Sequence, residues 1–373
     1  MTAGRYRLGA LLTRAQWTIS VPALALLELV LTWGSHPEGL LVAVIAVTLV
    51  GAVLASVHHA EVVAHQVGEP FGSLLLAASV TVIEVGLIVT LMAGGGHDTS
   101  ALARDTVFAA VMICINGIAG AALLVGALRQ RLAVFNPEGT GAALATVATI
   151  AVICLVLPTF TTSNPGPEFS GAQLGFAAVV SLAVYVLFVF TQTVRHRDFF
   201  LPVAADGSVR DLDGDDHADP PGVRSAVISA GMLLVALAAV VGLAKVESHP
   251  IEDAVDALGL PDGVVGVIIA LIVLLPESIA AVRHALADRV QISLNLAYGS
   301  AMASIGLTIP AIAVASIWLD GPLVLGLEST QVVLLAISLL VATLTVVPGR
   351  AKTLHGGLHL VLLAAYLFLA ANP

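Results

Sequence analysis

Eleven apolar stretches, each long enough to cross a lipid bilayer, occupy most of the chain. A helix rises about 1.5 Å per residue, so roughly 20 apolar residues cross a hydrocarbon core of about 30 Å. With 58% hydrophobic and 11% charged residues, a soluble chain could not bury so much apolar surface. The sequence therefore predicts an all-α polytopic membrane protein with about 11 transmembrane helices, embedded in the lipid bilayer. The stretches lie at about 17–34, 39–58, 70–94, 104–128, 139–160, 171–193, 224–245, 260–284, 290–318, 328–347 and 353–371.

The basic residues gather on one side of the predicted helices. With the N-terminus in the cytoplasm, 13 of the 15 Lys and Arg residues lie on the cytoplasmic side, and only Arg104 and Lys245 lie outside. Loops rich in Lys and Arg remain cytoplasmic. We therefore expect a multi-pass protein of the plasma (inner) membrane, with a cytoplasmic N-terminus and an outer C-terminus.

One long polar segment, rich in aspartate between 206 and 219, predicts an acidic cytoplasmic linker over 194–223. It follows a first group of five helices at 39–193 and precedes a second at 224–371, while 1–34 holds the N-terminal segment and the first transmembrane helix. Because five is odd, the second group enters the membrane with opposite polarity. This predicts helix 1 plus two inverted five-helix repeats.

Two acidic residues lie in the middle of predicted spans. Glu84 stands in SLLLAASVTVIEVGLIVTLM, and Glu277 stands in GVIIALIVLLPESIAAVRHA. A charge at the bilayer centre costs about 2.5–3.5 kcal/mol on insertion scales, so such acids are candidates for function. Because their helices run in opposite directions, we expect the two acids to meet near the midplane. Glu28 and Glu328 are weaker candidates, the first interpreted as structural or lipid-facing and the second as interfacial.

The two glutamates suit both a metal ion and protons. Two carboxylates balance one Ca²⁺, a cation that prefers oxygen ligands. Without the ion, two close carboxylates cannot both remain charged, so they take up protons. Pro276 removes one backbone hydrogen bond, and we expect a broken helix with a freed carbonyl near Ile272 or Val273. The alternative is that protonated glutamates simply form hydrogen bonds between helices.

Polar residues in the next helix of each half can add neutral oxygen ligands. These metal-site candidates are Asn116 in the first half, and Ser300 and Ser304 in the second. The competing interpretation is that small residues here allow close helix packing.

A histidine-rich cluster is predicted around the turn that follows residue 58. His58, Glu61 and His65 recur at helical spacing and share a face. We interpret this cluster as a region where protons or cations enter. The alternative is that its members are only polar side chains at the membrane interface. The full set of these weaker candidates is His58, His59, Glu61, His65 and Glu69, with His284 at the matching end of the helix that carries Glu277.

These features together resemble the bacterial calcium/proton antiporters of the ChaA/CAX type, in the cation/calcium exchanger superfamily. The resemblance spans the second to the eleventh predicted helix, and is carried by AEVVAHQVGEPFGSLLLAASVTVIEVGLIVTLM, ARDTVFAAVMICINGIAG and PESIAAVRHALADRVQISLNLAYGSAMASIGLTIPAIAVAS. It implies that Glu84 and Glu277 are the essential acids of the two repeats, with further ligands at Asn116 and at Ser300 or Ser304. Many members have Gly-Asn three to four residues before each acid, where this chain has Val80-Thr81 and Val273-Leu274.

The resemblance and the residues together imply a secondary active transporter, not an enzyme, that exchanges Ca²⁺ for protons. Its partners would be inorganic cations and protons, with no cofactor beyond Ca²⁺ as transported substrate. No nucleic acid is expected, because the basic residues are few and scattered. The alternatives are a Na⁺/H⁺ or K⁺/H⁺ antiporter of the same fold, a passive channel, and an intramembrane zinc protease. For the protease, the only candidate zinc site in the sequence is the His58–His65 region, which contains no HExxH motif.

Overall fold

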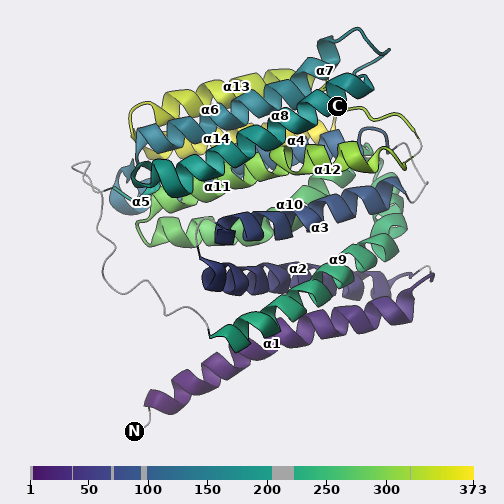
Figure 1. Cartoon of the computed structure of the whole chain (residues 1–373), viewed down its shortest axis with the longest axis vertical. Coiled ribbons are helices and arrows are strands. Elements are labelled where there is room, and N and C mark those ends of the chain that lie inside the picture. Colours follow the sequence, from purple (N-terminus) through teal and green to yellow (C-terminus); the bar gives the residue numbers. More distant parts are fainter. Residues whose placement is uncertain (1–2, 36, 69–70, 94–98, 204–221, 320) are drawn as a thin grey trace. The chain divides into compact units, whose positions relative to one another are not determined.

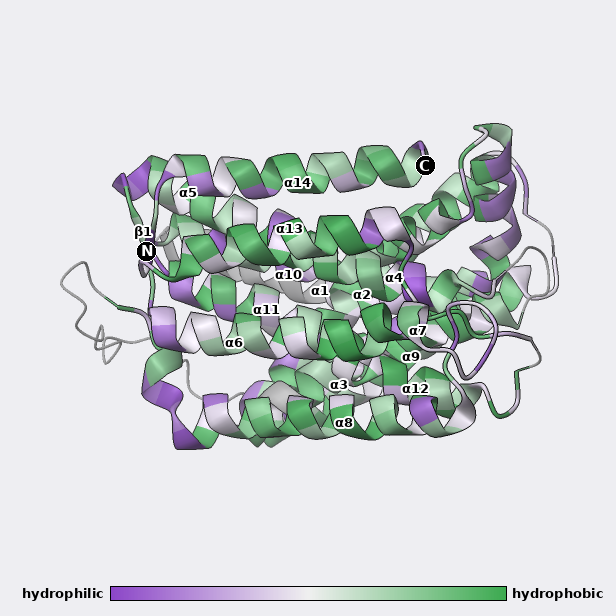
Figure 2. Ribbon diagram, turned by 90° about the horizontal axis from the view of Figure 1, so that it is seen from above, coloured by the Kyte–Doolittle hydropathy of each residue, from purple (hydrophilic) through white to green (hydrophobic). Residues whose placement is uncertain are grey.

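The computed structural model describes residues 3–35, 37–68, 71–93, 99–203, 222–319 and 321–373, and most of this part is helical (Figure 1). Ten of its helices are long and apolar enough to cross a membrane, and the first helix adds a shorter apolar part, Trp17–Thr32. Hydrophobic residues dominate the length of α8 (Gly171–Phe190), α13 (Ser329–Val346) and α14 (Thr353–Ala371) (Figure 2). The predicted all-α polytopic membrane fold is confirmed.

Contacts between residues divide the chain into two compact units. The first unit contains α1 (Ala3–Thr32), α2 (Leu40–Val67), α3 (Phe71–Met92) and α9 (Val223–Ala257) as far as Ala254. Within it, α2 packs against both α1 and α3. Polar groups join α1 to α2 at two levels: the Thr48 hydroxyl donates to Glu28 Oε1 at 3.2 Å, and His59 Nε2 lies 2.9 Å from the Thr18 carbonyl oxygen. Glu28 is therefore directed at a neighbouring helix.

Two helices of this unit are longer than predicted. The second apolar stretch was expected to end at 58, but α2 continues to Val67. Gly68 caps this helix, with a φ of +76° that suits glycine. The seventh was expected to end at 245, but α9 continues through Pro250 to Ala257. Polar residues end an apolar stretch without ending the helix. The histidine cluster consequently lies mostly within α2, not in a turn.

The second unit contains the remaining elements, and several of its membrane spans each consist of two or three consecutive helical segments. The first span comprises α4 (Leu102–Met112), η1 (Ile113–Ile118) and α5 (Ala119–Gln130), and the next comprises α6 (Pro137–Ala151), η2 (Val152–Val156) and α7 (Leu157–Phe160). The others are α8 with η3 (Thr191–Arg195), followed by η4 (Arg197–Phe200); α10 (Gly263–Leu286); α11 (Val290–Gly306) with α12 (Thr308–Ala315); α13; and α14. Two short strands, β1 (Ala133–Val134) and β2 (Arg350–Ala351), pair antiparallel and join the loops after α5 and α13.

Helix starts in this unit follow local sequence signals. Ser170 and Gln173 form a capping box at the start of α8, and Glu328 and Gln331 do the same for α13. Asn136 caps α6 by accepting hydrogen bonds from two backbone N–H groups, and Pro137 occupies the first helical position. These signals explain why predicted and observed boundaries agree closely here.

The centre of the second unit is the span formed by α4, η1 and α5. Its most apolar window is 89% buried, against 17% for α14. Glycines allow the neighbouring helices to approach it closely. A Cβ at Gly266 of α10 would lie 2.8 Å from the Thr106 nitrogen, and one at Gly120 of α5 would lie 2.7 Å from His359 Cβ of α14.

The expected break at Pro276 is not present. The helix α10 runs from Gly263 to Leu286 without interruption, with the proline inside it. The missing N–H removes only the bond to the carbonyl of Ile272, and packing on both sides holds the remaining turns in place. The irregular turns lie elsewhere, as the π-helical segments η1, η2 and η3.

Candidate ion-binding residues

Both predicted acids are buried at mid-length of long apolar helices. Glu84 lies in α3 with 2% of its surface exposed, and Glu277 lies in α10 with 7% exposed. The buried acidic residues in the described part of the chain also include Asp105 and Glu247. Asp105 is paired with Arg104, whose Nε donates to its Oδ1 at 2.8 Å. Burial of Glu84 and Glu277 agrees with a functional interpretation, since ionisable groups in a membrane are rarely retained without one.

Glu277 lies on the face of α10 that packs against its neighbours. Gly266 of that face meets the backbone of α4, and the Ala281 carbonyl accepts a hydrogen bond from Ser293 Oγ of α11 at 2.6 Å. Residues four apart on a helix share a face, so Glu277, four before Ala281, points in the same direction. The acid is therefore held in the packed interior of its unit.

The two predicted serines lie on the face of α11 that turns toward α10. Ser300 and Ser304 come 7 and 11 residues after Ser293, which places all three on one side of a helix with 3.6 residues per turn. Ser304 is buried and Ser300 is half-buried. Since Ser293 contacts α10, the two serines and Glu277 occupy facing sides of neighbouring helices.

Asn116 is buried in η1, but its side chain is directed at α13 and α14. Its Nδ2 donates to Ser338 Oγ at 2.8 Å, and its Oδ1 lies 3.0 Å from His359 Nδ1. Both polar atoms of the amide are therefore engaged by side chains that were not among the predicted site residues.

In the first unit, Glu84 has a hydroxyl neighbour on its own helix. Thr81 precedes it by one turn and is also buried. Gly86, on the same stretch, lies against Val241 of α9. In α10 the corresponding positions, Val273 and Leu274, are buried and apolar. The two acidic helices thus differ in the oxygen atoms that accompany the acid.

The predicted histidine cluster is divided between two faces of α2. His58, Glu61 and His65 were predicted to share one face of a helix, and all three are exposed, whereas His59 is buried and faces α1. His284 is half-buried near the end of α10, and Glu69 lies outside the described residues. Over the described ranges, no group of three or more His, Cys, Asp or Glu side chains is arranged to hold a metal ion.

Sequence reasoning missed Glu247. The apolar stretch was expected to end at 245, so this acid was placed in a loop. In the structure it continues the buried face of α9 formed by Ala236, Val240 and Leu243, and its Oε1 has no hydrogen-bond partner within the described part. The spacing of 3 and 4 residues along this face was the signal that could have identified it.

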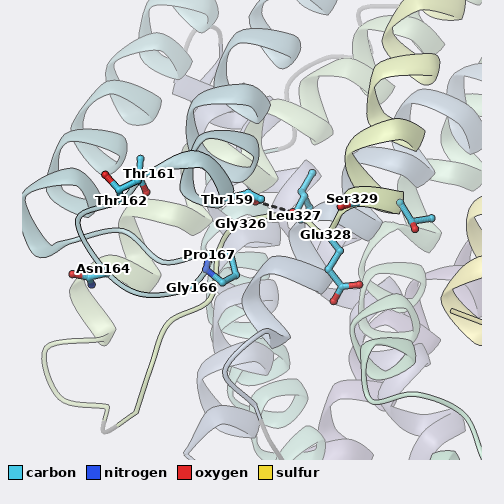
Figure 3. Close-up of a pocket in the computed structure, with 11 residues that line it drawn as sticks. Thr159, Thr161, Thr162, Asn164, Gly166, Pro167, Gly326, Leu327, Glu328 and Ser329 are labelled. Atoms are coloured by element: carbon cyan, nitrogen blue, oxygen red, sulfur yellow. Dashed lines mark hydrogen bonds between the residues drawn. The ribbon is translucent and has the colours of Figure 1, made fainter.

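A hollow of about 800 Å³ lies in the second unit beside the end of α7 and the start of α13 (Figure 3). Hydroxyl groups and the carboxylate of Glu328 line it, and Thr159 Oγ1 donates to the Leu327 carbonyl at 2.7 Å. Glu328 is also paired with Arg104 Nη2 at 3.3 Å. Glu277 and the α11 serines do not line this hollow, so it is separate from the predicted ion site.

The sequence has relatives of known class. The family model described as "Sodium/calcium exchanger protein" matches residues 38–194 and 228–372. A protein of Sinorhizobium fredii with the name "Putative ionic transporter y4hA" is 45% identical over 329 residues, 87% of each chain. The sodium-potassium/proton antiporter ChaA of Escherichia coli is 33% identical over 349 residues, 93% of each chain. A Ca²⁺/H⁺ antiporter of Aphanothece halophytica is 27% identical over 317 residues, 82% of each chain.

Solved structures share the fold. The structure of native YfkE superimposes with a TM-score of 0.71 over 96% of this chain and 99% of that one, at 16% identity. The crystal structure of the H⁺/Ca²⁺ exchanger CAX gives a TM-score of 0.69 over 98% of this chain and 89% of that one, at 15% identity. The resemblance to the ChaA/CAX type is confirmed by these matches. The chain therefore belongs to the sodium/calcium exchanger protein family and is a multi-pass membrane transporter of the cation/calcium exchanger superfamily.

Proposed function

We propose that this transporter exports Ca²⁺ from the cytoplasm in exchange for protons, and that Glu84 and Glu277 bind the same ion. The observation that carries the proposal is the burial of one glutamate at mid-length of each of two spanning helices, α3 and α10. A family of cation exchangers needs groups that hold a cation inside the membrane, and carboxylates supply the charge that a cation requires.

Competition for the same carboxylates is sufficient to couple the two fluxes. Two ionised glutamates neutralise one Ca²⁺, and in a medium of low dielectric constant they bind protons when the metal leaves. An ion-loaded and a proton-loaded transporter are then the stable forms. Exposure of each form to the two sides of the membrane in turn exchanges Ca²⁺ for protons.

Neutral oxygen atoms would complete the coordination. Ca²⁺ takes 6–8 oxygen ligands, so two carboxylates alone do not satisfy it. Ser300 and Ser304 of α11 are the candidates on the side of Glu277, and Thr81 is the candidate on the side of Glu84. Asn116 was predicted as a further ligand, but the bonds of its amide to Ser338 and His359 favour a different role, argued below.

The exposed face formed by His58, Glu61 and His65 is proposed to lie at the cytoplasmic end of α2, where ions approach. This follows from the positive-inside orientation, with the N-terminus in the cytoplasm and the protein in the plasma (inner) membrane. The acidic linker of 194–223 and the five-helix repeats on either side of it belong to the same proposal. Negative charge at the cytoplasmic surface raises the local concentration of cations.

Na⁺/H⁺ or K⁺/H⁺ exchange is the second candidate function. It is favoured by the 33% identity to ChaA, whose name gives sodium and potassium as its cations. The apolar Val273 and Leu274, one turn before Glu277, also reduce the number of oxygen ligands available on that side. A monovalent ion requires fewer charges, so a variant with one acid would then keep part of its activity.

Everted membrane vesicles distinguish these functions. Respiration acidifies the vesicle interior, and Ca²⁺, Na⁺ or K⁺ is then added outside while the pH gradient is followed. We expect Ca²⁺ to dissipate the gradient in wild type and not in Glu84→Gln or Glu277→Gln, while Glu138→Gln, an exposed acid of α6, behaves as wild type. If only Na⁺ or K⁺ dissipates the gradient, that ion is the substrate instead of Ca²⁺. A response that persists in both glutamine variants rejects these acids as the transport site.

A further inference from the structure

A chain of buried hydrogen bonds joins η1 to the last two helices of the second unit. Asn116, Ser338 and His359 are each fully buried. The Asn116 Nδ2 group donates to Ser338 Oγ at 2.8 Å, and Ser338 Oγ lies 3.7 Å from Met112 Sδ. On the other side of the amide, Asn116 Oδ1 lies 3.0 Å from His359 Nδ1. Because an amide oxygen only accepts, His359 must carry a proton on Nδ1.

This chain of bonds holds an unusual turn. The segment Ile113–Ile118 is π-helical, and such turns are rare, less stable than the α-helix, and frequent at functional sites. An α-helical turn in its place would rotate the following residues of α5 by about 100° relative to α4. Buried side-chain hydrogen bonds that form only with the wide turn would favour it over the regular helix.

The turn lies between two pairs of helices. It packs against α10 and α11, which carry Glu277 and the two serines, and also against α13 and α14. The contact with α14 is close, because a Cβ at Gly117 of η1 would lie 3.1 Å from Leu363 Cδ2 of α14. A change in η1 would therefore shift both α10 and α11, whereas α13 and α14 contribute no predicted ion ligand.

We infer that His359 and Ser338 are positioning residues of the ion site: they hold the Asn116 amide, and through it the π-helical turn against which α10 and α11 pack. In this role Asn116 stabilises the site without donating its oxygen to the ion. The inference rests on the proposed function only for its transport readout, since the turn itself can be observed directly.

Matched substitutions of His359 test the role of the Nδ1 donor. The amide nitrogen of asparagine can occupy the place of Nδ1, whereas that of glutamine reaches the place of Nε2. We expect His359→Ala and His359→Gln to raise the cation concentration for half-maximal exchange about five- to tenfold, the effect of one lost buried hydrogen bond. His359→Asn should stay within about twofold of wild type on the same reasoning. Ser338→Ala should behave like His359→Ala, and Ser338→Thr, which keeps the hydroxyl, like wild type.

A second readout does not depend on transport. In purified protein, amide hydrogen exchange of peptides covering 113–123 should be faster in His359→Ala and Ser338→Ala than in wild type, His359→Asn or the control Leu358→Ala, whose side chain is exposed on α14. Equal exchange in all five proteins overturns the inference. So does loss of cation exchange in Asn116→Ala together with unchanged half-saturation in His359→Ala, because Asn116 would then act as a direct ligand. Wild type without any cation/proton exchange rejects the proposed function, and hydrogen exchange still decides the positioning role.

Discussion

The Ser293 hydroxyl of α11 donates a hydrogen bond to the Ala281 carbonyl of α10 at 2.6 Å, one helical turn from Glu277. This bond fixes which side of α11 faces the acid-bearing helix. The same side carries Ser300 and Ser304, so these two hydroxyls are presented to α10 together with Ser293. The arrangement makes a graded set of predictions for the three serines.

Ser300→Ala and Ser304→Ala should weaken cation binding and leave the fold intact. Each removes one neutral oxygen from the proposed ion site, and we expect the half-saturating Ca²⁺ concentration to rise about three- to tenfold, consistent with affinity tuned by ligand number. The concentration dependence of gradient dissipation in vesicles measures this. Ser293→Ala is the matched control: it should lower thermal stability and change the half-saturating concentration less. The reverse ranking would assign the ion contact to Ser293.

Arg104 should matter for stability through Asp105 and not through Glu328. The side chains of Arg104 and Asp105 are 8% and 10% exposed, whereas that of Glu328 is 63% exposed. Arg104→Ala leaves a buried carboxylate without its cation and should destabilise the protein by about 3–5 kcal/mol. Glu328→Gln removes a solvated pair and should cost less than about 1 kcal/mol. Thermal unfolding in detergent compares the two, and equal losses would contradict the buried-pair interpretation.

Neighbouring glycines of α14 offer a test of helix packing. A Cβ at Gly356 would collide with the backbone of α5, whereas one at Gly357 would meet nothing within 4 Å. Gly356→Ala should therefore destabilise the protein by about 1–3 kcal/mol, as overpacking does, and Gly357→Ala should be close to neutral. The thermal midpoints of the two variants provide the measurement. A destabilising Gly357→Ala would mean that α14 is packed on the opposite face.

Hydropathy predicts the helices well because lipid requires every spanning segment to satisfy its own backbone. For that reason the bounds of α10, α13 and α14 lie within a few residues of the expected stretches. The same criterion fails where a helix leaves the apolar region. The ends of α2 at Val67 and α9 at Ala257 were missed, because polar residues end an apolar stretch without ending the helix, and Glu247 was missed with them.

Contacts between distant residues lay beyond sequence reasoning. Asn116 was predicted as an ion ligand, whereas the structure shows its buried amide bonded to Ser338 and His359, which lie 222 and 243 residues further on. No local pattern links such positions, and the π-helical turn contains no proline, while its Gly117 resembles glycines elsewhere in regular helices of this chain. Likewise, the spacing of His58, Glu61 and His65 predicted that they share one face, while the direction of His59 depends on its contact with α1.

The proton release that accompanies ion binding tests the central claim most directly. Purified protein in weakly buffered detergent solution would be titrated with Ca²⁺ while protons released per bound ion are recorded. If Glu84 and Glu277 exchange protons for the same ion, wild type should release up to about two protons per Ca²⁺, and Glu84→Gln or Glu277→Gln should bind Ca²⁺ far more weakly and release fewer. Tight Ca²⁺ binding without proton release, unchanged in both variants, would contradict the account.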